Sequence, residues 1–177
     1  MTKSDDLARI IIGCKNGDSE CFSQLVDIYA GRCYGYFYRM TGNKEVSDDL
    51  LSELFVRVVE KIGSQKGGSF EGWLFKTASN IFYDYLRDKQ RQKKLFELEG
   101  NQPEIKPAET ERLEDDEIDK LQKQLKRLDM DTKELITLRF YSELSFKEIA
   151  AMRSEPIGTT LSKVHRGLKK LRELMEQ

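Results

Sequence analysis

Proline, histidine and cysteine are all scarce in this sequence, and each shortage narrows the possibilities. The 177 residues include three prolines, one histidine and three cysteines. Few prolines, together with abundant Leu, Ile, Glu, Lys and Arg, favour amphipathic helices, so we expect an all-α fold. Cys14, Cys21 and Cys33 are odd in number and form no CxxC pair, and one histidine cannot build a metal site alone. We therefore expect buried free thiols, no metal site and no cofactor.

Long apolar runs are missing as well. Residues 1–6 lack the apolar segment of a signal peptide. No run approaches the roughly 18 apolar residues that a membrane-spanning helix needs. We expect a soluble, cytoplasmic protein with no membrane insertion.

Neither sign of charge is in clear excess, because the sequence has 30 basic and 31 acidic residues. The charges are instead segregated along the chain. Residues 87–94 and 163–172 are rich in Lys and Arg, whereas residues 97–119 are rich in Glu and Asp. Phosphate recognition requires local basic surface and not a basic total. The two basic segments are therefore candidates for nucleic-acid binding.

A change in composition divides the chain into two small helical domains. Gly100, Pro103 and Pro107 interrupt a run that is poor in large apolar residues. Such a run cannot bury a core and is typical of a linker. We expect domains at residues 1–94 and 117–177, joined by an acidic linker at 95–116.

Four helices are predicted in the first domain from apolar spacing, caps and glycine breaks. They lie from Leu7 to Cys14, from near Ser19 to a break at 41–43, from Ser47 to a stop at Gly63 with acidic residues in the first turn, and from Phe70 onward after a loop at 67–69. The fourth helix has polar residues at steps of three and four, which places them on one face. They are Lys76, Asn80, Asp84, Arg87 and Arg91. A solvated surface would explain some of them, but the aromatic neighbourhood and the basic end favour a functional face.

The second domain contains a predicted helix-turn-helix. Helices marked by apolar residues at 118–128 and 135–140 come first, and the second of these is capped by Asp131 or Thr132. Ser145-Phe146-Lys147-Glu148 then has the form of a capping box for a helix at 146–152. Pro156 suits the first position of the next helix. The positions expected to face the core are Ile157, Thr160, Val164, Leu168, Leu171 and Met175, and we also favour burial for Leu161 over contact with a thymine methyl group.

The outer face of this last helix is the predicted DNA-reading surface, because the N-terminal half of a recognition helix enters the major groove. Arg166 is the best candidate for reading guanine, since its planar fork matches the O6 and N7 acceptors, whereas lysines mainly hold phosphates. The alternative is that these polar groups only keep the surface soluble. The candidate residues are Thr159, Ser162, Lys163, His165, Arg166 and Lys169.

Both domains resemble the extracytoplasmic-function group of bacterial sigma factors, and their motifs occur in the order of that family. The first-domain motifs are Gly17-Asp18…Phe22…Leu25, Asp49-Leu50…Glu53…Phe55, and Phe70…Trp73-Leu74…Ala78…Asn80…Asp84…Arg87. The second-domain motif is Ile149-Ala150…Pro156…Gly158-Thr159…Ser162…Arg166…Leu171-Arg172. The likeness covers nearly the whole chain apart from the linker.

The resemblance implies a sigma factor that binds core RNA polymerase and directs transcription initiation by reading the minus-ten and minus-thirty-five promoter elements. It implies that the second domain sits on the beta flap and reads the upstream element. It also implies that the loop at 63–72 and the face bearing Lys76 engage the downstream element and an unstacked base. An anti-sigma factor is a further implied partner. The residues implied to bind the beta-prime clamp are Asp49, Leu50, Ser52, Glu53, Phe55 and Val56.

Alternatives from other classes are weaker. A helix-turn-helix regulator that does not replace a sigma factor would sense a ligand or dimerise through its first domain, and would bind promoters without polymerase. An enzyme finds little support, because the sequence has no Ser/His/Asp or Cys/His constellation, phosphate-binding glycine loop or metal cluster. The linker is either a simple tether or an electrostatic element that follows a basic polymerase channel or covers the basic helix. Neutralising Glu114, Asp115, Asp116 and Glu117 tests this.

Overall fold

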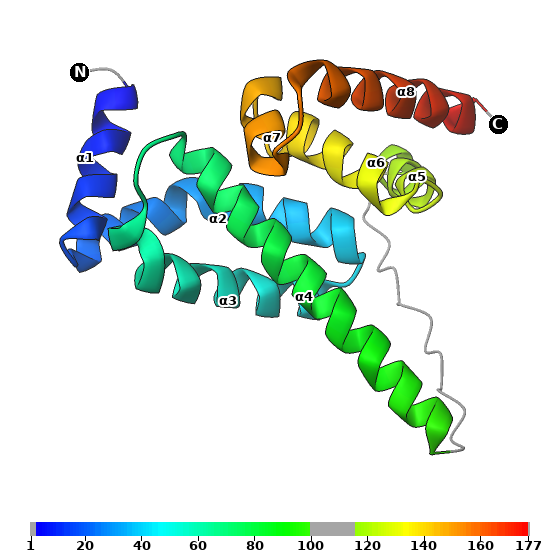
Figure 1. The fold of residues 1–177 in the computed structure, drawn as a ribbon, viewed down its shortest axis with the longest axis horizontal. Coiled ribbons are helices and arrows are strands. Elements are labelled where there is room, and N and C mark those ends of the chain that lie inside the picture. Colours follow the sequence, from blue (N-terminus) through cyan, green and yellow to red (C-terminus); the bar gives the residue numbers. More distant parts are fainter. Residues whose placement is uncertain (1–2, 100–115, 177) are drawn as a thin grey trace.

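The computed structural model describes residues 3–99 and 116–176, and this described part of the chain is helical without strands (Figure 1). The first domain contains α1 (Lys3–Lys15), α2 (Ser19–Thr41), α3 (Lys44–Lys61), the short η1 turn (Ile62–Ser64) and α4 (Phe70–Leu98). The second contains α5 (Asp116–Leu125), α6 (Met130–Ile136), the π-helical segment η2 (Thr137–Tyr141), α7 (Phe146–Arg153) and α8 (Ile157–Met175). The predicted all-α fold with a helix-turn-helix is confirmed. No helix of the described residues is long and apolar enough to cross a membrane.

Local side-chain chemistry determines where α2 begins and ends. The Asp18 carboxylate accepts hydrogen bonds from the backbone N–H groups of Glu20 at 2.8 Å and Cys21 at 3.0 Å. This N-cap starts α2 at Ser19, as predicted. Gly42 ends the helix with φ 68°, a left-handed conformation that glycine adopts without strain.

The predicted start of α3 was wrong by three residues. Asn43 has an extended backbone and accepts a hydrogen bond from a backbone N–H of the first turn, so the helix begins at Lys44 and not at Ser47. Ser47 is buried inside the helix, and its hydroxyl donates to the Asn43 carbonyl at 2.6 Å. The acidic residue of the first turn is therefore Glu45, because residues 48–49 lie one turn further on.

The first-domain core consists of aromatic and aliphatic side chains from all four helices. Its fully buried members include Leu25, Tyr29, Tyr36, Phe37, Leu54, Leu74, Phe75 and Phe82. The three cysteines are free thiols, with Cys14 and Cys33 buried and Cys21 half-buried. Burial raises the pKa of Cys14 to about 11 and that of Cys33 to about 12. These two thiols stay protonated near neutral pH and pack as small apolar groups.

In the second domain, the N-cap of α6 lies two residues before the earlier of its predicted caps. Asp129 has the extended backbone of an N-cap, and its carboxylate accepts a hydrogen bond from the Thr132 N–H at 2.9 Å. This hydrogen bond lowers the pKa of Asp129. Asp131 and Thr132, the predicted caps, lie within the helix.

The predicted helix-turn-helix is present. Ser145 and Glu148 form the expected capping box, in which the Glu148 N–H donates to Ser145 Oγ at 3.2 Å and the Ser145 N–H donates to the Glu148 carboxylate at 2.8 Å. Ser154 ends α7 in a left-handed conformation at φ 53°. Pro156 is the N-cap of α8, so the helix begins at Ile157, one residue after the first helical position that the sequence suggested.

The buried stripe of α8 is narrower than predicted. Thr160 and Val164 are buried as expected, and the stripe continues through Gly167, which the sequence did not indicate. Ile157, in the first turn of α8, and Leu161 are both exposed, so these two predictions were wrong. Leu161 follows Thr160 by one residue, which rotates it by about 100° around the helix, away from the buried stripe.

Gly167 allows α8 to approach α6 closely. A Cβ atom at this position would lie 2.5 Å from Thr132 Cγ2 and 3.2 Å from Ile136 Cδ1. We expect Gly167→Ala to lower the free energy of unfolding by about 1–2 kcal/mol, because overpacking exceeds the gain in helix propensity. Chemical denaturation measures this change.

Gly31→Ala is the matched control, because a Cβ at this exposed position in α2 has no heavy atom within 4 Å. It should be neutral or stabilise the protein by about 0.5–1 kcal/mol. If Gly167→Ala were as stable as the wild type, the close approach of α6 and α8 would be contradicted.

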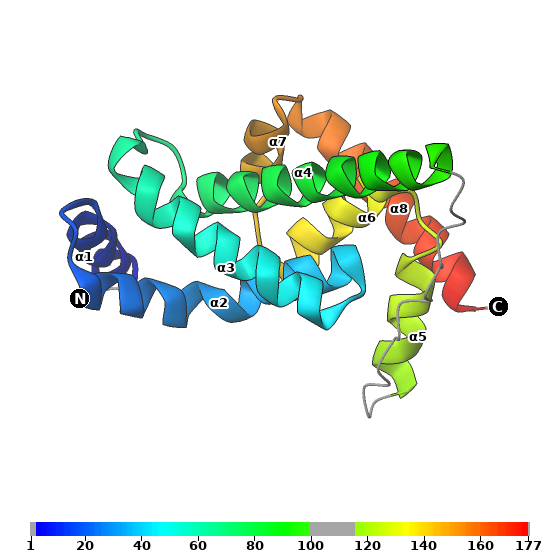
Figure 2. The same cartoon turned by 90° about the horizontal axis from the view of Figure 1, so that it is seen from below.

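The two domains pack directly against each other, which the sequence did not predict. In the views of Figures 1 and 2, the second domain lies beside α4, and α7 contacts α4 while η2 contacts α2. Apolar side chains of the second domain join the same cluster as the first-domain core. They include Leu135, Leu138, Leu144, Ile149 and Met152.

The end of α4 extends beyond the predicted domain boundary. The helix continues to Leu98, four residues past the boundary expected at residue 94, and its last part projects away from the first domain (Figure 1). The predicted linker at 95–116 therefore begins as helix. Its residues 100–115, which include Glu114 and Asp115, lie outside the described residues.

Candidate nucleic-acid interface

The outer face of α8 presents most of the predicted DNA-reading residues to solvent. Ser162, His165, Arg166 and Lys169 are exposed, and Thr159 is half-buried. Arg166 Nε donates to the Ser162 carbonyl at 3.3 Å, so the side chain lies along the helix surface. This arrangement leaves a guanidinium group and several shorter polar groups on one accessible face. Such a face can contact base edges and phosphates.

Lys163 differs from the other predicted contact residues because it is paired within the domain. Its Nζ donates to the Glu155 carboxylate at 2.8 Å and lies 3.5 Å from Asp131. Glu155 also accepts a hydrogen bond from the Thr160 hydroxyl at 2.7 Å. The hydrogen bond to Glu155 raises the pKa of Lys163. In this structure Lys163 therefore ties α8 to the turn of the helix-turn-helix.

The exposure of Ile157 and Leu161 adds apolar atoms to the start of the same helix. Leu161 is 43% exposed and immediately precedes Ser162. An exposed leucine beside polar readers can contact the methyl group of thymine. The sequence analysis assigned both residues to the core. Leu161 directly follows Thr160, which was expected to be buried, and this step of one residue was the signal that Leu161 faces another side of the helix.

The polar residues of α4 lie along one surface as their spacing predicted. Lys76, Asn80, Arg87 and Arg91 are exposed, and the two arginines lie on the part of α4 that includes its projecting end. Asp84 is half-buried and pairs with Arg87 and, at 3.7 Å, with Arg57 of α3. Asp84 therefore links α3 to the basic part of α4 through two arginine partners.

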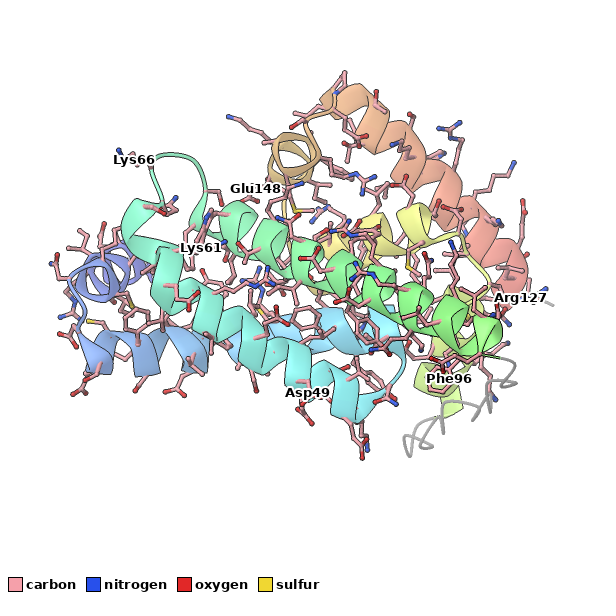
Figure 3. The ribbon with its side chains drawn as sticks, turned by 60° about the horizontal axis from the view of Figure 1, so that its bottom comes forward. Asp49, Lys61, Lys66, Phe96, Arg127 and Glu148 are labelled. Atoms are coloured by element: carbon pink, nitrogen blue, oxygen red, sulfur yellow. The ribbon has the colours of Figure 1, made fainter. Side chains whose placement is uncertain are left out.

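The N-terminal half of this face borders the second domain. A groove of about 660 Å³ lies between the two domains here. Its lining includes Gly68, Trp73 and Lys76 on one side and Lys147 and Met152 of α7 on the other. Figure 3 shows Glu148 close to the beginning of α4, on the side where the second domain lies. The predicted downstream-element surface is thus accessible at its C-terminal end and bordered by protein at its N-terminal end.

The outer face of α3 holds the predicted polymerase-binding residues. Asp49, Ser52, Glu53 and Val56 are exposed, and Phe55 is half-buried. In Figure 3, Asp49 lies on the opposite side of the first domain from Glu148.

The exposed residues of α3 differ from the expected polymerase-binding set at Leu50, which is buried, and at Val59, which is exposed. Leu50 is only 5% exposed and packs in the core, so it supports the helix and offers no contact surface. Val59 is as exposed as Val56, and the two form an apolar pair three residues apart. Sequence reasoning missed Val59, although its spacing from Val56 was a visible signal.

Each of the two domains matches a different sequence family. The family Sigma-70 region 2 matches residues 25–92, and the family Sigma-70, region 4 matches residues 124–173. CarQ, an RNA polymerase sigma factor of Myxococcus xanthus, is 30% identical over 166 residues, which cover 91% of this chain and 92% of CarQ. The chain belongs to the extracytoplasmic-function sigma factors of the sigma-70 family.

Further relatives agree with this membership. The ECF RNA polymerase sigma factor SigE of Mycolicibacterium smegmatis is 31% identical over 157 residues. The match covers 87% of this chain but only 61% of SigE, so the chain spans less than two thirds of that relative. The solved structure of the sigma factor RpoE in complex with the anti-sigma factor NepR, from Bartonella quintana, has a TM-score of 0.71 at 25% identity. The match covers 88% of this chain and 96% of RpoE.

A buried carboxylate connects the two domains of this sigma factor. Glu134 on α6 is only 1% exposed, and it accepts hydrogen bonds from groups on both domains. The donors are Tyr36 at 2.8 Å, Ser79 at 2.6 Å, Tyr83 at 3.1 Å and Arg153 at 3.0 Å. Burial, followed by the nearby carboxylate, raises the pKa of both tyrosines. Their hydroxyl groups therefore stay protonated and donate to Glu134.

Further polar contacts cross between the domains around this carboxylate. Arg32 of α2 pairs with Glu71 at 2.7 Å and donates to the Ser142 carbonyl of the second domain. The Arg39 guanidinium lies 3.5 Å from the ring centroid of Tyr141, within cation–π range. These contacts join residues far apart in sequence, so no local pattern could have indicated them.

Lys133 is a buried lysine at the boundary between the two domains. Its Nζ is buried and donates to the Met40 carbonyl at 3.0 Å, near the C-terminal end of α2. Burial, and then the like charge of Lys126, lower the pKa of Lys133 from 10.5 to about 8. Its protonation is therefore linked to folding in the mildly alkaline range.

The low pKa of Lys133 makes a pH-dependent contribution to stability. Between the folded pKa of about 8 and the ordinary value of 10.5, the unfolded chain binds more protons at this lysine than the folded one, so stability rises with pH in this window. The free energy of unfolding of the wild type, minus that of Lys133→Met, should rise by about 1–2 kcal/mol from about pH 7 to about pH 9.5.

The subtraction removes the effects of other titrating groups, including the buried thiols, which act equally in both proteins. Denaturation at several pH values measures the difference. A difference that is constant with pH would mean that Lys133 keeps its ordinary pKa.

Proposed function

We propose that this chain binds core RNA polymerase and directs it to initiate transcription at a specific set of promoters. The observation that carries the proposal is the match to sigma-70 regions 2 and 4, in that order, in a chain whose two domains each have an exposed polar and basic helix face. In this proposal, residues 1–94 bind the polymerase clamp and the minus-ten element. Residues 95–116 are the linker, and residues 117–177 read the minus-thirty-five element.

Within the second domain, α8 reads the upstream element from the major groove. Arg166 contacts guanine through its planar fork, and Ser162 and His165 add shorter polar contacts. Exposed basic residues further along α8 hold phosphates, which makes binding weaker as salt rises. These are Lys169, Lys170 and Arg172. Lys163 takes this role only by leaving its partner Glu155.

Within the first domain, the polar face of α4 engages the downstream element. Lys76 lines a groove together with Gly68 of the loop that precedes α4, and Asn80 lies one turn further along the helix. Arg87 and Arg91 lie toward its exposed end. The aromatic surface near the loop, including the half-buried Trp73, suits stacking with an unpaired base. Extrusion of a base costs a few kcal/mol, which contacts of this kind offset.

Polymerase contributes by fixing the positions of both domains. The α3 face with Val56 and Glu53 docks on the beta-prime clamp, and the second domain sits on the beta flap. Each domain alone contacts a short DNA element, and holding both on one enzyme gives a high effective concentration for the second contact. Specificity then belongs to the whole complex.

Other features of the proposal follow from the family. The chain acts in the cytoplasm, contributes no chemistry of its own, and is restrained by an anti-sigma factor whose surface overlaps the polymerase-facing surfaces. The relative RpoE was solved in complex with such a protein. The acidic linker is proposed to act electrostatically, and neutralising its carboxylates tests this against a simple tether.

Affinity purification of the tagged chain with purified core RNA polymerase tests the proposal. We expect a stable complex that survives gel filtration, and little promoter binding by the chain alone. The rival, a helix-turn-helix regulator, predicts tight promoter binding without polymerase and no complex with the core enzyme. The two hypotheses therefore predict opposite results for core polymerase binding and for promoter binding by the chain alone.

A further inference from the structure

The first two turns of α8 expose two aliphatic side chains to solvent. Ile157 is 44% exposed and Leu161 is 43% exposed. They are four residues apart, so they lie next to each other on one side of the helix. Single exposed aliphatic residues are common on protein surfaces. This pair, however, lies in the N-terminal half of the helix, which is the part that meets base edges in a helix-turn-helix.

The pair belongs to one of two parallel rows of residues on α8. Each row advances by four residues, and the rows lie about 100° apart around the helix. The first row begins with apolar residues and consists of Ile157, Leu161 and His165. The second row consists of Gly158, Ser162 and Arg166. A Cβ atom at Gly158 would meet no heavy atom within 4 Å, so the surface beside the apolar pair is open to a partner.

We propose that Leu161, flanked by Ile157, is a specificity-determining residue that reads the methyl group of a thymine in the upstream promoter element. The proposal rests on the function proposed above, because it requires that α8 enters the major groove. The surroundings of the pair favour DNA as its occupant. Lys169 and Arg172 are exposed further along α8 and complement the charge of DNA phosphates. The apolar pair is also continuous with the row that ends at His165, one of the proposed polar readers.

The chemistry of the side chain explains why it would select thymine. Thymine presents a methyl group in the major groove, and the other three bases do not. Contact between this methyl group and Leu161 removes apolar area from water on both partners. Opposite the amino group of adenine or cytosine, or the O6 atom of guanine, leucine would displace water without replacing its hydrogen bonds. Leu161 therefore both favours thymine and disfavours the other bases.

Deoxyuridine tests this contact at the level of one methyl group, because uracil differs from thymine only in lacking it. A promoter used by the complex of this chain with core polymerase would be synthesised with the thymines of its upstream element replaced by deoxyuridine one at a time. Competition binding to the complex measures each duplex. With the wild type, we expect at least one replacement to weaken binding by about fourfold, the factor expected from burying one methyl group. With Leu161→Ala, the same thymine and uracil duplexes should bind equally.

Three controls separate a reading role from a structural one. Leu161→Met keeps an apolar side chain of similar volume, so it should keep the preference for thymine over uracil. Ile28→Ala changes an exposed aliphatic residue of α2 and should respond to uracil as the wild type does. Measuring the ratio of affinities within each variant is itself the third control. A merely structural defect would weaken binding to all duplexes equally and leave the ratio between thymine and uracil unchanged.

The outcomes separate this proposal from the proposed function. If no uracil replacement weakens binding by the wild type, or if Leu161→Ala keeps the wild-type ratio, Leu161 does not read a methyl group and the proposal is overturned, while the proposed function stands. If Leu161→Ala instead loses retention on core polymerase, the apolar pair is a polymerase contact and the proposal is overturned as well. If the wild type starts RNA synthesis at no new site, the proposed function itself fails, and this inference fails with it.

Discussion

Replacing Arg166 by alanine should change which promoters are used, and not simply reduce transcription everywhere. Arg166 is exposed on the N-terminal half of α8, where a recognition helix meets base edges. Loss of a bidentate contact to guanine costs about 1–3 kcal/mol at that position, which corresponds to a loss of about fivefold to 150-fold at the preferred promoters. Promoters with another base there should be much less affected. Reconstituted transcription on a mixed promoter library measures the ranking.

Two further variants separate base reading from charge. Lys169→Ala should weaken all promoters similarly and reduce the dependence of binding on salt, because it removes a phosphate contact. Arg166→Lys keeps the positive charge but loses the planar fork, so it should change the ranking as alanine does. An unchanged promoter ranking in Arg166→Ala would contradict the base-reading role.

Replacing Val56 by glutamate should disrupt the complex with core polymerase. Val56 is 57% exposed and lies beside Val59 on the outer face of α3, so the substitution should leave the fold intact. In a docked interface, the new carboxylate would be buried without a partner, which costs about 2 kcal/mol or more. We expect retention on core polymerase to fall by at least about thirtyfold.

Ile28→Glu is the matched control, because Ile28 is also an exposed aliphatic residue but lies on α2. It should bind core polymerase as the wild type does. Circular dichroism of both variants confirms that they are folded. Equal retention of Val56→Glu and the wild type would mean that the α3 face is not the clamp-binding surface.

The parts of the fold that the sequence predicted correctly depend on local chemistry. Asp18 caps α2, Ser145 and Glu148 form the capping box of α7, and Gly42 ends α2 as expected. Each of these signals involves residues within one turn of each other, so a sequence displays them directly. The exposed polar stripe of α4 was also visible, because helical spacing alone places its members on one face.

The errors arose where two local signals competed. Asn43 and Ser47 can both cap a helix, and only Asn43 has the extended backbone that the cap requires. Asp129 displaced the predicted caps of α6 for the same reason. Leu161 was assigned to the core on its spacing to Val164 and Leu168, but it follows the buried Thr160 by one residue and is exposed.

The contact between the domains could not be predicted from the sequence. Glu134 follows Lys133 in what looks like an ordinary solvated helix, yet both are buried by groups about 50 to 100 residues away. A charged residue is almost never fully buried without partners, and the partners become visible only in the folded chain. The contact between the domains was therefore hidden, whereas the exposed polar faces of α4 and α8 were not.

Transcription initiation with purified components tests the central claim most directly. Core RNA polymerase would be incubated with a library of genomic fragments, with and without this chain, and the 5′ ends of the RNA would be mapped. We expect new start sites only with the chain, sharing two upstream sequence elements at a constant separation. Core polymerase that neither retains the chain nor starts RNA at any new site in its presence would contradict the account.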